Sequence, residues 1–449
     1  MLINFSLENW LSFRDKVTFS MVATRERRHK ERIHDVSFGP NRTKILPISV
    51  IFGGNASGKT NFFKALSFAK KFVVQGAQPN NLIPVTPYLF DDQGLARPSF
   101  FALTILIDSK IYEFSFSVTQ EKVWEEKLVL SLNSRDKELY HRRGQTIEFS
   151  EELKKDQSLG IYFKGTRDNL LFLTNSIFQQ VEIFKPIYDW FDKTLLMIGP
   201  DSRFTLFDKF INENDPFYRI MNDMLSNLDC GIDHLSLADV AFDSLNAPPK
   251  ALTSIKELVK EGQTYRFRLE STNERIVITR ENGQLIAKKL MTSHLKEDGS
   301  EIKFNFSQET DGAQRIIDLL PIFIELFRYK SNIVCFIDDF DRSLHTVLLC
   351  KLIKGYLSDF NKDTLTQLIF TCHDITLIDQ RIFRWDEIWV TERDYDGAAK
   401  LIPFSDYKDI RYDKDIRKSY LQGRFGGIPS ILFPGSLVNR GGAAESEPG

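Results

Sequence analysis

The chain has 449 residues, of which 42% are hydrophobic and 27% charged, and its formal net charge is −2. This balance is typical of a globular protein with room for about two or three domain-sized cores. The near-neutral charge excludes a global electrostatic attraction to DNA. The sequence shows no long apolar stretch and no cationic-then-apolar start, so we expect neither a membrane span nor a signal peptide. Four scattered cysteines without C-x-x-C spacing predict reduced thiols. We therefore expect a cytoplasmic protein without a membrane partner.

Residues 1–150 are expected to form the N-terminal lobe of the protein. Alternating apolar residues predict a two-strand hairpin near the start of the chain, with its turn at residues 10–15. Residues 45–52 are a continuous apolar run, typical of a strand buried on both faces, and residues 60–73 carry apolar side chains at helical spacing. Between residues 98 and 132, further alternation predicts an antiparallel meander.

The rest of the chain divides by pattern into three parts. Residues 151–300 mix helical and alternating stretches, and we interpret them as a helical or mixed insertion, an arm or lid. In residues 301–435 the strand–helix alternation returns, and its long crossovers predict parallel strands and an α/β core. Residues 436–449 are rich in Gly, Ala and Glu and are predicted to be a disordered tail.

The segment "GGNASGKT" matches the phosphate-binding pattern G-x-x-x-x-G-K-[ST]. Small residues let backbone N–H groups surround a phosphate, and the N-terminus of the following helix adds its dipole. Lys59 is expected to reach the β- and γ-phosphates of ATP, and Thr60 to offer its hydroxyl to Mg²⁺. The predicted nucleotide-binding residues are Gly53, Asn55, Ala56, Ser57, Gly58, Lys59 and Thr60.

The segment "NIVCFIDDFDRSLH" places three carboxylates at the tip of a second buried strand. A phosphate cradle needs an acidic partner on a neighbouring strand, so Asp338 is the predicted Mg²⁺ ligand. Asp339 is placed to polarise the attacking water and is predicted to be catalytic. The alternative is a nuclease-type metal cluster in which Asp339 and Asp341 are ligands.

Two further motifs complete the predicted site. "FTCHD" puts His373 at the end of the next strand, where it could sense a γ-phosphate, so we predict a catalytic role for it. "SQETDGAQR" is a small, polar turn that opens a helix, which is either an anion site or an ordinary helix cap. Since the cradle already holds one set of phosphates, Thr310, Asp311 and Gly312 are predicted to act on the nucleotide of another subunit.

With these motifs, residues 1–433 resemble the ABC-type ATPases of the SMC and RecF class, and more closely the abortive-infection and OLD-type branch. "GGNASGKT", "TDGAQR", "CFIDDFDRSLH" and "IFTCHD" stand where that class has Walker A, the signature, Walker B with its dimer-contact loop, and the switch histidine. "PYLFDD", "PSFFALTILIDSKIYEFSFSV" and "YLQGRFGGIP" are similar to ATPases encoded beside a toxin or nuclease in anti-phage operons, such as those of the AbiL/RloA kind and of the PARIS system.

The resemblance implies an α/β fold, an ABC-type P-loop ATPase head with a parallel core sheet, an antiparallel β subdomain and an inserted, mostly helical arm. It also implies paired heads that sandwich ATP, with the contact at Ser343, Leu344 and His345. The chain departs from the family pattern at the signature, which reads Thr-Asp-Gly, and at Asp339, which replaces a longer Glu. A base displaced by about 1 Å can lose on the order of a hundredfold in rate, so slow hydrolysis is expected.

The function we expect is an ATP-binding and hydrolysing sensor or scaffold in bacterial anti-phage defence. Its expected partners are a second copy, in a dimer or larger oligomer, and a separately encoded nuclease or toxin effector, because only a short tail follows the last motif. A phage protein or DNA is the candidate trigger. The alternative is a RecF/SMC-like ATPase of DNA repair or chromosome maintenance that acts on double-stranded DNA. A third possibility is a stand-alone metal nuclease that works without Lys59.

Overall fold

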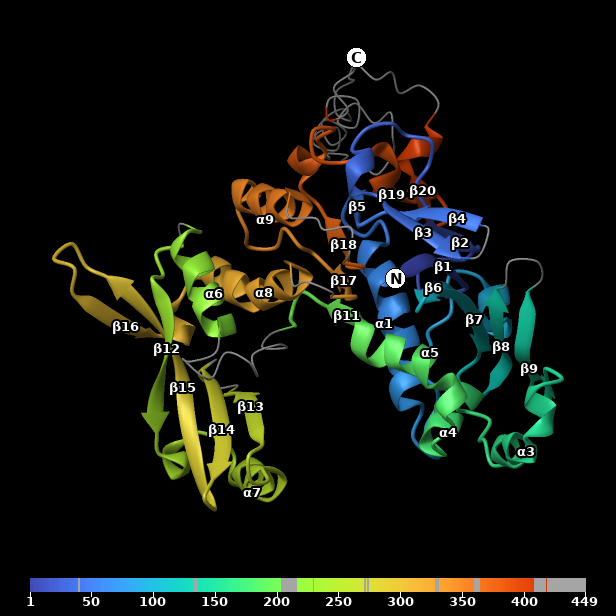
Figure 1. Ribbon diagram of the computed structural model, residues 1–449, viewed down its shortest axis with the longest axis horizontal. Coiled ribbons are helices and arrows are strands. Elements are labelled where there is room, and N and C mark those ends of the chain that lie inside the picture. Colours follow the sequence, from blue (N-terminus) through green and yellow to red (C-terminus); the bar gives the residue numbers. More distant parts are fainter. Residues whose placement is uncertain are drawn as a thin grey trace, which may run out of the picture.

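The computed structural model describes residues 1–407 except 39–40, 132–135, 203–215, 229, 270–271, 273, 328–330 and 359–363, together with residue 417. Within these residues the chain forms a head and a smaller β-rich arm (Figure 1). The expected α/β fold, with a parallel core sheet and an antiparallel β subdomain, is confirmed. The motif at residues 420–429 and the tail at 436–449 lie outside the described residues. No helix of the described chain is both long and apolar enough to cross a membrane.

A six-stranded sheet forms the centre of the head. Its order is β11-β17-β18-β5-β19-β20, and all neighbours are parallel except the last pair. The strands are β5 (Ile48–Gly53), β11 (Leu195–Ile198), β17 (Val334–Ile337), β18 (Gln367–Cys372), β19 (Ile388–Arg393) and β20 (Ala399–Pro403). Every residue of β5, β17 and β18 is buried, as their continuous apolar sequences predict. Since these three strands are parallel, their carboxyl ends, where the motifs lie, meet at one edge.

Helices cover both faces of this sheet. They are α1 (Lys59–Gln75) on one face, and α8 (Asp311–Phe327) and α9 (Thr346–Ser358) on the other. On the α1 side, the rings of Phe62 and Phe336 lie 6.0 Å apart between centroids. Alternate residues of β5 enter the two cores, Ile51 on the α1 side and Val50 on the α8 side. The sheet is therefore held rigidly from both faces, which fixes the residues at its edge.

A seven-stranded antiparallel sheet lies on the other side of α1 (Figure 1). Its order is β10-β9-β8-β7-β6-β1-β2. The strands are β1 (Leu2–Glu8), β2 (Val17–Ser20), β6 (Ser99–Ile107), β7 (Lys110–Val118), β8 (Val123–Ser131), β9 (Lys137–Arg143) and β10 (Thr146–Phe149). The predicted hairpin and the predicted meander are both present. A separate hairpin joins β3 (His34–Phe38) and β4 (Asn41–Ile45), and α2 (Asp92–Ala96) precedes β6.

Residues 151–198 pack on the head. Their helices are α3 (Gln157–Lys164), α4 (Phe172–Phe178) and α5 (Lys185–Asp189). Leu159, Phe172 and Ile187 belong to the same core as α1 and the antiparallel sheet. The segment then supplies β11, an edge strand of the central sheet. In this structure the segment from residue 151 to 198 is thus part of the head.

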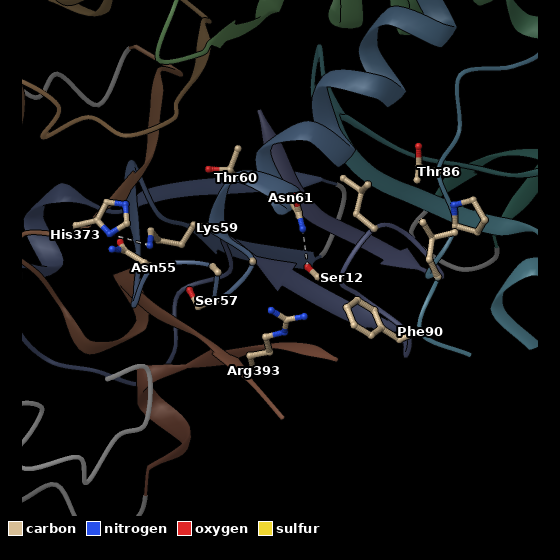
Figure 2. Close-up of a pocket in the computed structure, with 15 residues that line it drawn as sticks. Ser12, Asn55, Ser57, Lys59, Thr60, Asn61, Thr86, Phe90, His373 and Arg393 are labelled. Atoms are coloured by element: carbon tan, nitrogen blue, oxygen red, sulfur yellow. Dashed lines mark hydrogen bonds between the residues drawn. The ribbon is translucent and has the colours of Figure 1, made fainter. Parts of the chain in front are cut away.

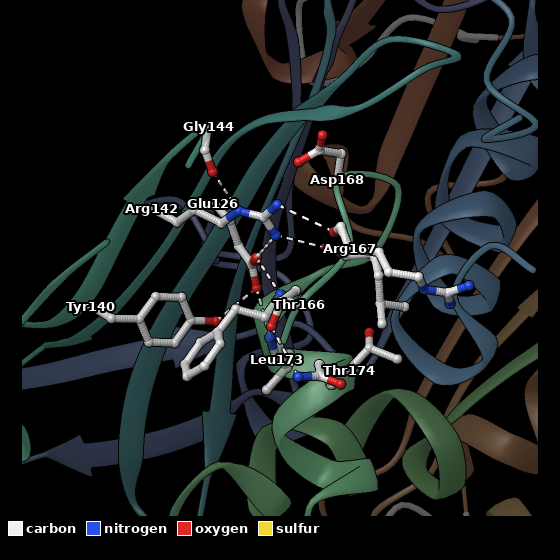
Figure 3. A network of polar contacts seen from close by, with 12 residues as sticks. Glu126, Tyr140, Arg142, Gly144, Thr166, Arg167, Asp168, Leu173 and Thr174 are labelled. Carbon is white, nitrogen blue, oxygen red and sulfur yellow. Dashed lines mark hydrogen bonds and ion pairs between the residues drawn. The ribbon is translucent and has the colours of Figure 1, made fainter. Parts of the chain in front are cut away.

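A buried carboxylate anchors α4 to the antiparallel sheet (Figure 3). Both carboxylate oxygens of Glu126 accept backbone N–H groups at the start of the helix, from Phe172 at 2.6 Å and from Leu173 at 2.9 Å. The Tyr140 hydroxyl donates to the same carboxylate at 3.0 Å, and Arg142 lies 3.6 Å away as the paired charge. Burial raises the pKa of Glu126 and outweighs these partners. The helix N-terminus is satisfied inside the protein, where water does not reach.

The arm, residues 234–305, is a five-stranded antiparallel sheet with one helix against it (Figure 1, green to yellow). Its elements are β12 (His234–Val240), α7 (Pro249–Leu258), β13 (Thr264–Arg268), β14 (Arg275–Glu281), β15 (Gln284–Leu295) and β16 (Glu301–Asn305). α6 (Pro216–Ser226) packs between the arm and α8. The expected arm was mostly helical, and the structure corrects this. Short alternating stretches such as "TYRFR" and "RIVITR" pair into a sheet, because each strand buries one face only when neighbours are beside it.

Candidate nucleotide-binding site

The segment Gly53–Thr60 forms a loop between β5 and α1, the context expected of a phosphate cradle. Gly58 has φ 119° and Ala56 has φ 61°, so the loop turns through the left-handed region twice. A Cβ on Gly53 would lie 2.2 Å from the Thr391 hydroxyl oxygen and 2.5 Å from that of Ser57. Only glycine fits at position 53, so close packing against Thr391 and Ser57 explains the first glycine of the motif.

Lys59 is buried at the first position of α1. Its ammonium donates to the carbonyl oxygens of Gly53 at 2.7 Å and Gly54 at 3.0 Å, and lies 3.2 Å from Nδ1 of His373 (Figure 2). Burial lowers the pKa of Lys59, and the neighbouring aspartates oppose this change. A cation held in this way, facing a loop of backbone groups, suits a polyphosphate.

Asp338 directly follows β17 and is fully buried. One carboxylate oxygen accepts the Thr371 hydroxyl at 2.7 Å, while the other, Oδ2, is buried without a hydrogen-bond partner in the described chain. Burial raises the pKa of Asp338, and the Thr371 hydroxyl, followed by that of Thr60, partly offsets the rise. An oxygen pair from Thr60 and Asp338 is the donor set that Mg²⁺ prefers, and a cation would relieve the cost of the buried charge. These residues fit the metal that was predicted.

Asp339 and His373 lie in contact at the ends of two neighbouring strands. Nε2 of His373 is 3.3 Å from Oδ1 of Asp339, and this contact lowers the pKa of the carboxyl. Because the Lys59 ammonium can only donate, Nδ1 of His373 accepts from it and Nε2 carries the proton. Asp339 has φ 48°, and its backbone N–H donates to the Thr371 hydroxyl at 2.8 Å. The structure thus brings the two predicted catalytic residues together.

Asp341 has a positioning role that the sequence did not reveal. One of its oxygens accepts the backbone N–H groups of both His373 and Asp374, at 2.9 and 3.0 Å. The carboxylate therefore fixes the backbone that carries His373. This contact accounts for the third aspartate of the motif without a nuclease-type cluster, and no group of three or more His, Cys, Asp or Glu residues suited to a metal occurs in the described part of the chain.

The predicted signature turn, Thr310–Gly312, lies at the start of α8 and does not line the cavity beside the cradle. Thr310 caps the helix, since its hydroxyl accepts the N–H of Ala313 at 3.2 Å. A Cβ on Gly312 would lie 2.8 Å from the carbonyl oxygen of Ser343, so the turn packs on the predicted contact loop. Arg315 of the same helix reaches the carbonyl oxygen of Asp338 at 3.5 Å. The turn thus packs on the predicted contact loop, and its helix reaches the end of β17 through Arg315.

A cavity of about 590 Å³ opens beside the cradle (Figure 2). Besides the motif residues and His373, its lining includes residues for which the sequence analysis proposed no role: Leu11, Ser12, Asn61, Thr86, Pro87, Leu89, Phe90 and Arg393. The "PYLFDD" stretch, noticed only as a point of resemblance, was the available signal for Phe90. No local pattern marks Arg393, which reaches the cavity from the end of β19.

Fold and site together define a P-loop ATPase. A family described as "AAA domain, putative AbiEii toxin, Type IV TA system" matches residues 48–379, and the chain belongs to this family. No significant match is found among curated proteins.

Two solved structures are similar to the chain. One is the SMC head domain from Thermotoga maritima, which is 14% identical in sequence and has a TM-score of 0.36. The match covers 90% of this chain and 98% of the SMC head chain. The other is an SMC head bound to the C-winged helix domain of ScpA, with 12% identity, 89% and 96% covered, and a TM-score of 0.39.

Proposed function

We propose that this protein is an ATP-binding and hydrolysing subunit of a bacterial anti-phage defence system, in which it senses or scaffolds and controls a separate effector. One observation carries the ATPase part of the proposal. Lys59 at the start of α1, Asp338 and Asp339 after β17, and His373 after β18 converge at one edge of the parallel sheet. This is the edge where α/β folds bind their ligands.

Each residue has a chemical task in this proposal. Lys59 and the loop N–H groups bind the phosphates, and Thr60 and Asp338 hold Mg²⁺, which when bound neutralises charge on the β- and γ-phosphates. Water attacks the γ-phosphorus, the bond from that phosphorus to the bridging oxygen of ADP breaks, and Asp339 takes the proton of the water. His373, whose Nε2 faces Asp339 and whose Nδ1 faces Lys59, holds Asp339 in place and stands next to the γ-phosphate position.

Hydrolysis is expected to be slow. The contact with His373 lowers the pKa of Asp339, which keeps the carboxylate ionised but makes it a weaker base. Asp339 is also one methylene shorter than the usual Glu, and its backbone amide is fixed to Thr371. We expect a turnover at the low end of the range for such enzymes, about 1 s⁻¹ or less.

We propose that two copies assemble head to head, so that Thr310, Asp311 and Gly312 of one chain face the nucleotide of the other. In support of this, the turn lies outside the cavity of its own chain and packs on the contact loop at Ser343. An N-terminal helix end with free N–H groups attracts phosphate. Nucleotide-dependent dimerisation, measured by light scattering with and without ATP, tests this step. Retention of a monomer with bound ATP would contradict it.

The defence role is supported by the family description, which names a toxin–antitoxin system. Within that context we propose an ATPase of the AbiL/RloA or PARIS kind that holds or releases a nuclease or toxin encoded nearby, with a phage protein or DNA as trigger. Co-purification of the protein from its native operon, before and after phage infection, tests the separate effector. Protection of cells by this chain alone would contradict it.

The ATPase itself is tested by comparing wild type with Lys59→Ala. The variant should lose nucleotide binding at least about 100-fold, because it removes a buried cation that faces the phosphates. Lys64→Ala, an exposed lysine on the same helix, is the matched control and should bind as wild type does. Strong stimulation of wild-type turnover by double-stranded DNA would instead favour the RecF-like alternative. DNA cleavage that survives Lys59→Ala would favour a metal nuclease.

A further inference from the structure

The cavity beside the cradle has two chemically different ends. The cradle end is polar and carries Lys59, Thr60 and His373. The other end is formed by Leu11, Pro87, Leu89, Phe90 and Arg393. Leu89 and Phe90 are 60% and 64% exposed, which is unusual for large apolar side chains beside a phosphate site. The full volume of about 590 Å³ lies within the range of about 300–1,000 Å³ for small-molecule sites.

The segment that presents Phe90 is fixed in place although its side chain is exposed. The carbonyl oxygen of Thr86 accepts the N–H of Leu11 at 2.9 Å. Tyr88 is buried, its N–H donates to Asn9 at 3.1 Å, and its hydroxyl donates to the carbonyl oxygen of Asp396 at 2.9 Å. Because the backbone is anchored at Thr86 and Tyr88, just before Phe90, the ring is preorganised and little conformational entropy is lost when a ligand binds it.

Arg393 lies over the ring of Phe90, with its guanidinium carbon 5.2 Å from the ring centroid. Its Nε donates to the carbonyl oxygen of Gly397 at 3.0 Å, which orients the guanidinium plane. A Cβ on Gly397 would lie 3.4 Å from the edge of the Phe90 ring and 3.3 Å from Arg393. The β19–β20 turn therefore packs against both side chains and holds them as one unit.

We propose that Phe90 and Arg393 form the subsite for the base of the nucleotide whose phosphates lie in the cradle, and that this subsite selects purines by stacking. The inference rests on the proposed nucleotide site and specifies its ligand. Every base has a π-face, but a purine covers more of a ring and of the flanking Leu11 and Leu89 than a pyrimidine does. The Arg393 guanidinium, which covers one face of the Phe90 ring, adds a cation–π contribution to a base that stacks on the exposed part of this pair.

The subsite contacts the flat face of the base and does not recognise the hydrogen-bonding groups at its edge. Several polar groups at this end have protein partners: the Asn61 amide donates to the Ser12 hydroxyl at 2.9 Å, the Ser12 carbonyl oxygen accepts the N–H of Ala399 at 2.7 Å, and Nε of Arg393 donates to Gly397. The Thr86 carbonyl oxygen accepts a hydrogen bond from the N–H of Leu11. A site discriminates strongly between two similar ligands when its buried polar groups form hydrogen bonds with one ligand. The other ligand then leaves those groups without a partner, which costs binding energy. ATP and GTP should therefore bind within about tenfold of each other.

The test compares four ligands, ATP, GTP, CTP and inorganic tripolyphosphate, by calorimetry with Mg²⁺. Phe90→Ala should bind ATP about 10- to 100-fold more weakly than wild type, the effect of one lost base–aromatic stack. It should bind tripolyphosphate equally well, because the cradle is unchanged. Phe90→Trp should keep the affinity for ATP. Leu82→Ala removes an equally exposed apolar side chain that does not line the cavity, and should change nothing.

The outcomes separate this inference from the proposed function. Unchanged ATP affinity in Phe90→Ala would overturn the subsite while leaving the cradle in place, and so would a preference for ATP over GTP above about 100-fold. A parallel loss of ATP and tripolyphosphate in Phe90→Ala would also overturn it. Wild-type protein that binds neither ATP nor tripolyphosphate would overturn the nucleotide site as a whole, base subsite included.

Discussion

Oδ1 of Asp339 lies 3.3 Å from Nε2 of His373, and this contact joins the ends of β17 and β18. The other ring nitrogen of His373 faces the Lys59 ammonium at 3.2 Å. The predicted base, the predicted sensor and the phosphate-binding lysine thus form one chain of contacts. A substitution of any one of these three residues should therefore alter the position or the electrostatic environment of the other two.

Asp341 should act on turnover through His373. Asp341→Ala removes the acceptor of two backbone N–H groups, so His373 loses its fixed position. We expect kcat to fall about tenfold or more, whereas ATP affinity should change less than about threefold. Asp341→Asn keeps a carbonyl oxygen in place and should restore most of the rate. Steady-state phosphate release and ATP binding are the measurements, and an Asp341→Asn variant as slow as Asp341→Ala would contradict the positioning role.

Glu387 should make stability depend on pH. It is buried directly before β19, and burial raises the pKa of its carboxyl to about 8. The folded protein therefore keeps a proton that the unfolded chain releases above about pH 4.5. Because the native state binds more protons, the free energy of unfolding should fall as pH rises from about 4.5 to about 8, by at most about 1.4 kcal/mol per pH unit.

Denaturant unfolding across that pH range tests the role of Glu387. Glu387→Gln should flatten the pH dependence, because the amide does not titrate. Glu257→Gln, at an exposed position on α7, should leave the dependence as in wild type. Equal slopes in wild type and Glu387→Gln would show that the pKa of Glu387 is ordinary.

A buried ion pair connects the arm to α8, the helix that begins at the predicted signature turn. Arg275 of β14 and Asp318 of α8 make two contacts, at 2.6 and 2.8 Å, and the guanidinium lies 3.6 Å from the centroid of the Phe306 ring. Arg275→Met should lower the free energy of unfolding by about 3–5 kcal/mol, because it leaves a buried carboxylate without its counter-charge. The double variant Arg275→Met, Asp318→Leu should recover most of this loss. A single variant as stable as wild type would mean that the pair contributes little.

The sequence predicts the parallel core and the convergence of the motif residues well, for a physical reason. A strand buried on both faces must be apolar throughout, and β5, β17 and β18 show this without help from distant residues. The steric need for glycine at position 53 likewise leaves a fixed spacing in the sequence. Since parallel strands share one edge, the convergence of Lys59, Asp338 and His373 followed from the motifs alone.

What the sequence did not predict depends on contacts between distant segments. The arm was expected to be mostly helical, and its sheet was not predicted because each strand gains stability only from its neighbours. The role of Asp341 depends on hydrogen bonds from backbone N–H groups. Every residue except proline has such a group, so no sequence motif indicates which ones Asp341 binds. Phe90 and Arg393 meet only because the β19–β20 turn packs against the "PYLFDD" segment.

The direct test of the ATPase site is the turnover of Asp339→Asn measured together with its ATP affinity. The variant keeps the shape of the side chain and removes the base, so the affinity should stay within about threefold of wild type. Phosphate release should fall at least about 100-fold, the typical contribution of a general base. An Asp339→Asn variant that hydrolyses ATP at the wild-type rate would contradict the assignment of Asp339 and the mechanism built on it.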